Sequence, residues 1–145
     1  MSIKDFKEKF NIDALSIKKY KHWTVSVRPN QITLSCLIVS INRECESLSE
    51  LTESETQELS MIFKDIETKF CKWVSFEKMN YLALMMLDSI VHFHVIPRYN
   101  NSRTFEEKSF HDLNWPNHPS DLDSGISDMA TVKKIRKRII LEANS

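Results

Sequence analysis

The chain of 145 residues contains a single glycine, Gly125, and this scarcity limits what it can fold into. Phosphate-binding loops of the Walker type and the dinucleotide fingerprint both need several glycines, because backbone amides must approach the phosphates closely. Glycine-rich barrels and the nucleophile elbow of lipases depend on glycine as well. The sequence therefore excludes the Walker and dinucleotide sites and argues against the barrel and elbow folds.

The length and the charge balance describe an ordinary globular chain. A chain of 145 residues suits one domain and buries roughly two-thirds of the surface that its unfolded form exposes. We therefore predict that residues 1–145 form a single domain. The 20 basic and 20 acidic residues give a formal net charge of zero. This balance offers no electrostatic argument for a nucleic acid or a membrane surface as the main partner.

Cysteine usage and hydropathy both favour the cytoplasm. The three cysteines, Cys36, Cys45 and Cys71, are odd in number and widely spaced, so they suit neither a disulfide framework nor a zinc ribbon. We interpret them as reduced thiols. No apolar run approaches the ~18 residues of a membrane span. Residues 1–10 are charged throughout and lack the apolar segment of a secretion signal.

Four apolar stretches predict strands that pair as two hairpins. They are Ile17–Val27, Ile32–Ile41, Met79–Leu87 and Ile90–Ile96. The first hairpin is expected to turn at Pro29–Gln31 and the second at Asp88 and Ser89, which would make a tight turn. Pro97 has no N–H to donate to a ladder, so we expect it to end the last strand.

Two helices are predicted from their caps and apolar stripes. Thr52 and Glu55 form a capping box at the start of a helix that runs from about 53 to 73. Its apolar stripe, interpreted as core, is Leu59, Ile62, Phe63, Ile66, Phe70 and Trp73. Ser127 or Asp128 is expected to cap a last helix that ends near Ala143. Between the strands and this helix, residues 100–124 form a long polar segment that we predict to be irregular.

Two of the five histidines, His92 and His94, lie two residues apart in the last predicted strand. Side chains alternate along a strand, so both imidazoles share one face about 7 Å apart, with Ile90 and Ile96 beside them. Such a pair suits metal ligation with further ligands, a nucleophile with a neighbouring hydrogen-bond donor, or half-buried structural histidines. The spacing alone does not choose between these roles.

Around these histidines the chain resembles the histidine-triad (HIT) family. The stretch from His92 to Arg98, His-Phe-His-Val-Ile-Pro-Arg, is similar to the end of the HIT signature, His-φ-His-φ-His-φ-φ followed by Pro-Arg, where φ is apolar. Asn80 stands where HIT proteins often carry an asparagine that contacts the nucleotide. Trp115 and Pro116 resemble a tryptophan-proline pair of some HIT branches. The resemblance covers roughly residues 15–119, including the order of the predicted elements.

The resemblance implies an α+β fold: a five-stranded antiparallel sheet with a long helix packed on it and a C-terminal helix, assembled as a homodimer. It implies an enzyme that hydrolyses or transfers nucleoside monophosphates joined to phosphate, amine or acyl groups, including dinucleoside polyphosphates. His92 aligns with the middle histidine, which forms a covalent nucleotidyl-histidine. His94 aligns with the last histidine, which donates to the phosphate oxygens. No cofactor and no metal are implied.

The chain departs from the HIT pattern at three places near the triad. The first triad position is Ile90, which neither donates nor shuttles a proton, so we expect slow turnover. The segment Met85–Ser89 replaces the usual glycine and glutamine, and Glu44 stands where a histidine often follows the second strand. The residues able to compensate are Ser89, Arg98, His111 and His118. The substrate-binding residues that we predict are Asn80, Ser89, Arg98 and Trp115.

These departures keep two further hypotheses open. One is a nucleotide-binding or regulatory HIT-like protein that retains the pocket with weak or no catalysis. The other is a metal-binding protein that uses His92 and His94 with a third ligand that the sequence does not identify. Met85 and Met86 are compatible with an apolar pocket for a base, but we interpret both as core residues.

Overall fold

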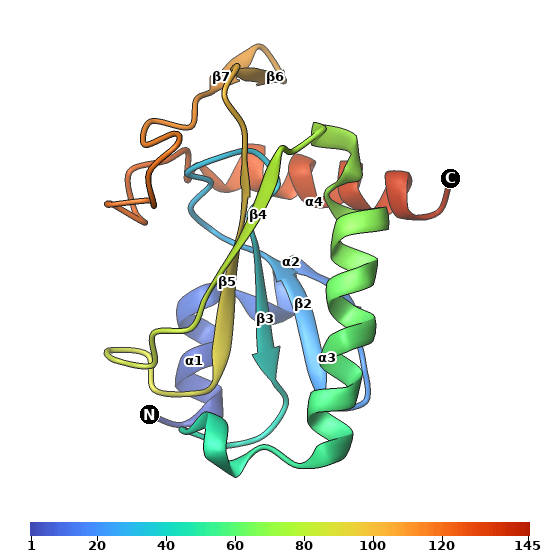
Figure 1. Cartoon of the computed structure of the whole chain (residues 1–145), viewed down its shortest axis with the longest axis vertical. Helices are drawn as coiled ribbons and strands as arrows, with labels where there is room; N and C mark the ends of the chain where they lie inside the picture. Colours follow the sequence, from blue (N-terminus) through green and yellow to red (C-terminus); the bar gives the residue numbers. More distant parts are fainter.

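The apolar, β-branched stretches of the chain form a five-stranded antiparallel sheet with the strand order β1-β2-β3-β5-β4 (Figure 1). The computed structural model describes residues 1–145. The strands are β1 (Ser16–Lys19), β2 (Trp23–Val27), β3 (Leu37–Ile41), β4 (Lys78–Leu82) and β5 (His92–Arg98). The predicted α+β class and five-stranded sheet are confirmed.

Helices lie on both faces of the sheet (Figure 1). They are α1 (Ile3–Phe10), α2 (Ile12–Leu15), α3 (Glu53–Asp65) and α4 (Met129–Ala143), with short turns η1 (Leu48–Glu50), η2 (Ile66–Phe70) and η3 (Lys72–Val74). The predicted capping box is present, since the Glu55 N–H donates to Thr52 Oγ1 at 3.2 Å and the Thr52 N–H donates to Glu55 Oε1 at 2.8 Å. The helix predicted to residue 73 ends as an α-helix at Asp65 and continues through the π-helical turn η2 and the 3₁₀ turn η3.

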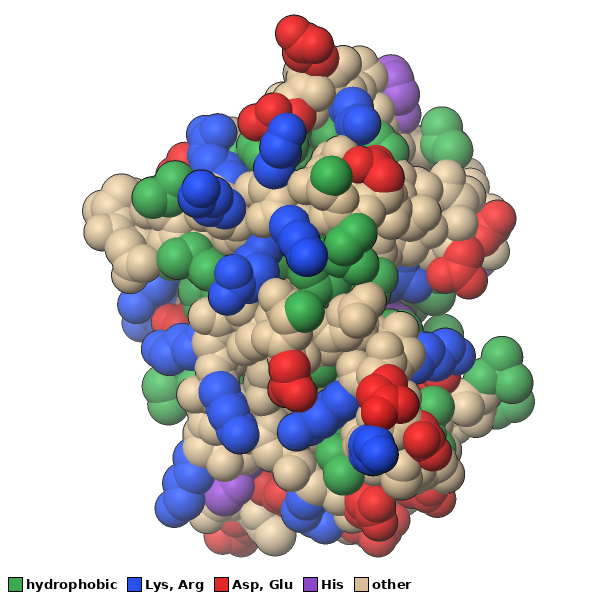
Figure 2. All heavy atoms as spheres, turned by 180° about the vertical axis from the view of Figure 1, so that it is seen from behind, with side chains coloured by type: hydrophobic (Ala, Val, Ile, Leu, Met, Phe, Trp, Pro, Cys, Tyr) green, Lys and Arg blue, Asp and Glu red, His purple; other side chains and the backbone are tan.

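The C-terminal helix α4 packs against η2, β1 and β2. Asp128 is its cap and accepts from the Thr131 N–H at 3.1 Å. Its buried apolar residues are Val132, Ile135 and Ile139. Its basic residues are mostly exposed, and in Figure 2, which views the molecule from behind, Lys and Arg side chains lie among acidic and apolar ones. None of the helices combines the length and the apolar character needed to cross a lipid bilayer.

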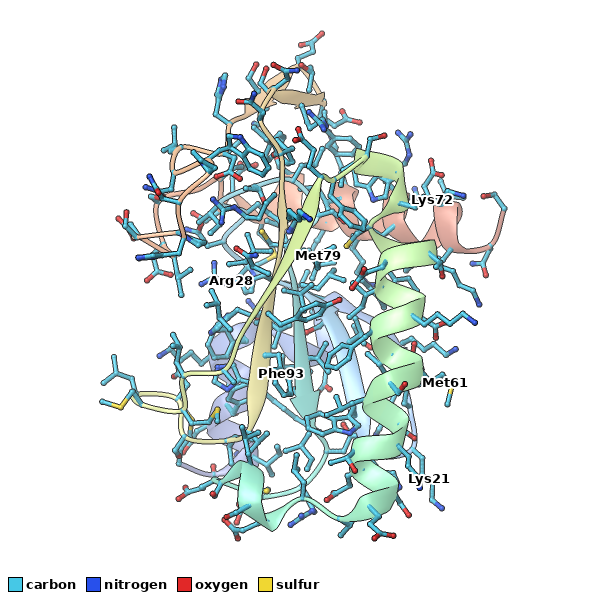
Figure 3. All side chains as sticks on the ribbon, in the orientation of Figure 1. Lys21, Arg28, Met61, Lys72, Met79 and Phe93 are labelled. Atoms are coloured by element: carbon cyan, nitrogen blue, oxygen red, sulfur yellow. The ribbon has the colours of Figure 1, made fainter.

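The two faces of the sheet carry different side chains, because neighbouring residues of a strand point to opposite sides. His92 and His94 lie on the face that α1 covers. Phe93 lies on the opposite face, where Phe63 of α3 meets it edge-on with 6.0 Å between ring centroids. Figure 3 shows Met61 on the side of α3 that points away from the sheet. The strand between two packed layers therefore holds the histidines rigidly.

The first predicted hairpin differs from the structure at both of its strands. The stretch Ile17–Val27 forms two strands, β1 and β2, and the next strand begins at Leu37 rather than Ile32. β2 and β3 do pair, but residues 28–36 connect them instead of a turn at Pro29–Gln31 alone. The cause is Gln31, a buried side chain whose amide binds four backbone groups of this connection. Its partners are the carbonyls of Arg28 and Cys36 and the N–H groups of Ser35 and Cys36.

The second predicted pair of strands is also corrected. β4 ends at Leu82 and β5 begins at His92, so residues 83–91 form a loop and the predicted tight turn at Asp88 and Ser89 is wrong. The backbone of Met85 is left-handed, with a φ of 40°, which breaks the extended conformation. The apolar run predicted a strand because apolar residues usually pack inside a sheet. In this loop they wall a cavity instead.

Pro97 does not end the last strand, which continues to Arg98. β3 begins at Leu37, opposite Val95, so Pro97 lies outside the ladder between β3 and β5. The Pro97 carbonyl accepts from Thr33 Oγ1 at 2.6 Å, a residue of the connection that precedes β3. The missing N–H therefore costs no hydrogen bond of the sheet.

Residues 100–124, predicted to be irregular, contain a small hairpin of β6 (Arg103–Phe105) and β7 (Lys108–Phe110). The only glycine follows this segment at a close backbone approach. Gln31 and Ile126 exchange N–H···O bonds of 2.8 and 3.1 Å. A Cβ on Gly125 would lie 2.1 Å from the Gln31 carbonyl oxygen, so any side chain would disrupt this bridge. The bridge holds residues 121–126 against the β2–β3 connection.

Candidate active site

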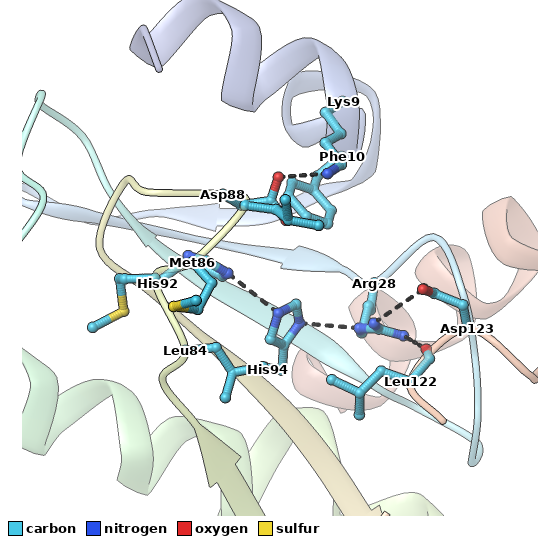
Figure 4. Close-up of a pocket in the computed structure, with 12 residues that line it drawn as sticks. Lys9, Phe10, Arg28, Leu84, Met86, Asp88, His92, His94, Leu122 and Asp123 are labelled. Atoms are coloured by element: carbon cyan, nitrogen blue, oxygen red, sulfur yellow. Dashed lines mark hydrogen bonds and ion pairs between the residues drawn. The ribbon is translucent and has the colours of Figure 1, made fainter. Parts of the chain in front are cut away.

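The two histidines of β5 line a cavity of about 230 Å³ (Figure 4). His92 is 1% exposed and His94 is 5% exposed. Their ring centroids lie 4.8 Å apart, closer than the spacing of their positions along the strand suggested. The lining residues come from α1, the β2–β3 connection, β5 and two further loops. They are Lys9, Phe10, Arg28, Leu84, Met85, Met86, Leu87, Asp88, His92, His94, Leu122 and Asp123.

The helix α1 closes one side of the cavity. Phe6 packs on His92 with 5.0 Å between ring centroids, and Phe10 lies 6.0 Å from His92 and 6.2 Å from His94. At the rim, Lys9 Nζ binds the Asp88 carboxylate at 2.5 Å. Apolar rings around the imidazoles exclude water and make any charge on them costly.

A chain of hydrogen bonds fixes both imidazole rings. Arg28 Nε–H donates to His94 Nδ1 at 3.0 Å, and the Nε2 atoms of His94 and His92 lie 3.2 Å apart. His92 Nδ1 lies 2.6 Å from the Ile90 carbonyl oxygen and must carry a proton, since a carbonyl only accepts. The neutral His92 therefore keeps its lone pair on Nε2, and the N–H of His94 Nε2 donates to it.

Burial keeps both histidines neutral. It lowers the pKa of His94 to about 3, helped by the positive charge of Arg28 and by His92. It also lowers the pKa of His92, although the hydrogen bond to the Ile90 carbonyl acts in the opposite direction. At pH 7 the pair therefore consists of a neutral base, His92 Nε2, and a neutral donor, His94 Nε2–H.

Acidification from pH 7 to pH 5 is expected to destabilise the protein through His94. The unfolded chain regains an imidazole pKa near 6.5, roughly the ordinary value, whereas folded His94 stays neutral down to about 3. Between these values the unfolded state binds more protons, so the free energy of unfolding falls by about 1.4 kcal/mol per pH unit as the pH drops below 6.5. Urea unfolding at several pH values measures this slope. His94→Gln should lower it, and a slope in this variant equal to that of the native protein would contradict the assignment.

The residues predicted to bind substrate lie apart from this cavity. Arg98 Nη1 donates to Asn80 Oδ1 at 2.7 Å, and Arg98 forms a buried ion pair with Asp112 at 2.6 Å. Ser89 Oγ donates to Glu46 at 2.9 Å. Trp115 is half-buried and joined to Pro116 by a cis peptide bond. The structure brings Asn80 and Arg98 together and places none of the four in the cavity lining.

The histidines that were expected to compensate for the missing first triad histidine lie outside the cavity. His111 and His118 are exposed and do not line the cavity. Ile90 was expected on the histidine face of the strand, but it precedes β5 and its side chain is fully buried. What Ile90 supplies is its carbonyl, because the chain turns there before the ladder begins. Glu44 accepts the Ile3 N–H at 3.3 Å and thus binds α1.

Several cavity residues were missed from the sequence. Arg28 was not identified as a site residue, although it follows β2 in the register that shares the histidine face. Lys9 and Phe10 belong to α1, for which the spacing of Ile3, Phe6 and Phe10 was an available helical signal. The interpretation of the loop methionines as core is wrong, since both line the cavity and Met86 is 83% exposed. A metal site needs further ligands, and the structure assembles no group of three or more His, Cys, Asp or Glu side chains suited to a metal ion.

The fold of the chain matches solved structures of histidine-triad proteins. A HIT protein of Sinorhizobium meliloti superposes with a TM-score of 0.72 at 20% identity, over 93% of each chain. A histidine triad protein of Bradyrhizobium japonicum gives 0.65 at 17% identity, over 90% of this chain and 94% of that one. A hypothetical histidine triad nucleotide-binding protein of Sulfolobus tokodaii gives 0.68 at 13%, over 97% and 91%.

No family model matches the sequence, and no curated protein matches it either. At identities of 20% and below, the structural likeness shows the fold. The chain therefore has the fold of histidine-triad proteins, and its two histidines occupy the strand that resembles the HIT signature. The sheet, long helix and C-terminal helix expected from that resemblance are confirmed.

Proposed function

We propose that residues 1–145 form one HIT-like domain that acts as a nucleotide phosphohydrolase or nucleotidyl transferase in the cytoplasm. Its substrates are dinucleoside polyphosphates or conjugates of nucleoside phosphates. The observation that carries the proposal is the neutral His92 with its lone pair on Nε2 and the His94 donor 3.2 Å away. A base and a donor at this distance suit attack on phosphorus with stabilisation of the phosphoryl oxygens.

The reaction proceeds in two displacements. The His92 Nε2 lone pair attacks the α-phosphorus, and the bond from phosphorus to the leaving oxygen or nitrogen breaks with its electron pair. The nucleotidyl-imidazolium keeps its Nδ1–H on the Ile90 carbonyl, which stabilises the new positive charge. Water, or another acceptor in a transfer, then attacks phosphorus, and the P–N pair returns to Nε2. The acceptor oxygen stays bonded to phosphorus and loses its proton to solvent or to the leaving group that the first displacement released.

The walls of the cavity suit the two ends of such a substrate. The His94 donor lies beside His92 in the cavity lining, where the phosphoryl oxygens would be. The apolar side chains of Phe10, Leu84 and Met86 line its outer part and offer a surface for a nucleobase (Figure 4). In this arrangement the apolar loop 83–91 would contact the base, while the histidines would contact the phosphates.

The direct test is to trap the intermediate. The protein is incubated with a dinucleoside polyphosphate that is radiolabelled at the α-phosphate, quenched in base and separated from free nucleotide. We expect a protein-bound label that acid releases, as a phosphoramidate requires. Absence of label together with turnover would contradict the covalent mechanism.

The alternative function is a nucleotide-binding or regulatory protein with weak or no catalysis. It is favoured by Ile90 at the first triad position and by the His94 N–H that occupies the lone pair of His92 at rest. Under this alternative, equilibrium dialysis would detect bound nucleotide, while the labelling experiment would give neither label nor product.

We further predict that the protein is a homodimer. β4 lies at the edge of the sheet, and its residues Lys78–Leu82 are only partly buried. Leu84, Met86 and Leu87 of the following loop are exposed in the single chain. A second copy would cover this edge and its apolar loop. Sedimentation at micromolar concentration should give twice the 17.1 kDa of one chain, and a monomer mass would refute the prediction.

A further inference from the structure

Arg28 is buried beside the histidines and is anchored from two sides. Its side chain is 4% exposed and follows β2 directly. Nη1–H groups donate to the carbonyls of Asn30 at 2.9 Å and Leu122 at 2.5 Å. Nη2 lies 3.7 Å from the Asp123 carboxylate, whose side chain is exposed (Figure 4). These contacts fix the plane of the guanidinium, and with it the direction of the Nε–H.

The fixed Nε–H points at His94 Nδ1, 3.0 Å away. A guanidinium only donates, so it can bind this nitrogen only where the nitrogen carries a lone pair. We propose that Arg28 is a positioning residue, which holds His94 in its Nε2–H tautomer and thereby directs the His94 donor at the nucleophile and at an approaching phosphoryl oxygen. This inference rests on the proposed function for the task of His94, while the tautomer itself is a property of the resting protein.

The other tautomer would disable the donor. With the proton on Nδ1, His94 Nε2 would present a lone pair to the His92 lone pair at 3.2 Å. A phosphoryl oxygen that entered the cavity would then meet repulsion where the native ring offers an N–H. Loss of one donor to a developing oxyanion typically lowers the rate by about 10²–10³-fold. Arg28 therefore exerts its effect through His94 and without taking part in bond formation.

A simpler role for Arg28 is to hold residues 121–125 against the β2–β3 connection. Asn30 provides the control for this role, because it holds the same residues. Asn30 Nδ2–H donates to the Asp123 carbonyl at 2.9 Å, and the Gly125 N–H donates to Asn30 Oδ1 at 2.8 Å. Asn30 has no hydrogen bond to either histidine. The variant Asn30→Ala therefore weakens the same attachment and leaves the Arg28–His94 bond in place.

Two variants of equal charge separate the hydrogen bond from the charge. In Arg28→Gln the amide nitrogen lies the same number of bonds from Cα as the arginine Nε, so an N–H still reaches His94 Nδ1. In Arg28→Met a methyl group takes that position and donates nothing. Both variants remove the positive charge, so a difference between them reports the donor. The glutamine oxygen is disfavoured there, because it would require the tautomer that opposes two lone pairs.

The measurement is ¹⁵N NMR of protein labelled at histidine, which distinguishes Nδ1–H from Nε2–H rings. We expect His94 to be Nε2–H in the native protein, in Arg28→Gln and in Asn30→Ala, and to gain the Nδ1–H form in Arg28→Met. The rate of nucleotidyl-histidine formation should fall about 10²-fold in Arg28→Met and less than about 10-fold in Arg28→Gln.

Three results would overturn the inference: an Nδ1–H ring in the native protein, an unchanged ring in Arg28→Met, or an equal change in Asn30→Ala. If Arg28→Met does not fold, the His94 tautomer in the native protein and in Arg28→Gln decides. An Nδ1–H form of His94 in either protein contradicts the inference, and an Nε2–H form in both supports it. If the native protein forms no nucleotidyl-histidine, the proposed function fails, and the tautomer measurement still tests Arg28.

Discussion

Replacement of His92 by alanine is expected to abolish nucleotidyl transfer, with a loss of at least about 10⁴-fold in rate. His92 Nε2 is the nucleophilic nitrogen of the pair, because its lone pair accepts only the exchangeable His94 N–H, whereas His94 Nδ1 is bound to Arg28 and His94 Nε2 carries a proton. Nothing else in the lining replaces it. Release of labelled nucleoside monophosphate, together with the acid-labile protein label, measures the effect.

The matched control is His94→Ala, which removes a donor and leaves the nucleophile. We expect a smaller loss, about 10²–10³-fold, with the label still detectable. Both side chains are almost fully buried, so circular dichroism and urea unfolding must show that each variant is folded at the assay temperature. Native activity in folded His92→Ala would rule out the covalent mechanism. An equal loss in the two variants would show that they act as one unit.

The parts of the fold that could be predicted are those governed by local rules. The capping box at Thr52, the cap at Asp128 and the apolar stripes of α3 and α4 depend on contacts within one or two turns, and the structure shows them. The strand that carries His92 and His94 was found because alternation puts both on one face. Its start was placed two residues early, since a continuous apolar run does not mark where pairing begins.

The candidate site was predicted only where it lies on one strand. Arg28, Lys9 and Asp123 reach the cavity from segments far apart in the sequence, and nothing in their local sequence places them near the histidines. The loop at Met85 and Met86 was misjudged because hydropathy reports apolar character without saying what it contacts. Its side chains line a cavity, so a ligand or a second copy, rather than the core of this chain, would cover them.

Arg98 was predicted to bind substrate from its place beside a motif, and the structure shows which groups it contacts in the single chain. It follows the histidine strand and was predicted to bind substrate, yet it donates to both oxygens of Asp112 at 2.6 and 2.9 Å. Two further donors bind Asn80 Oδ1 at 2.7 Å and the Asn117 carbonyl at 2.6 Å. All the bonds of this guanidinium lie within the protein, and the side chains of the ion pair are 5% and 4% exposed.

Arg98→Met is therefore expected to destabilise the protein by about 3–5 kcal/mol, because it leaves the Asp112 carboxylate buried without its partner. The double variant Arg98→Met/Asp112→Leu should regain most of this loss, since an apolar pair of similar volume removes the uncompensated charge. Urea unfolding of the native protein, both single variants and the double variant gives the four values of the cycle. For the fraction that stays folded, labelling of His92 should proceed within about 3-fold of the native rate, a change too small for the loss of a substrate contact. An Arg98→Met variant that is as stable as the native protein and has a strongly raised KM would show that Arg98 contacts the substrate.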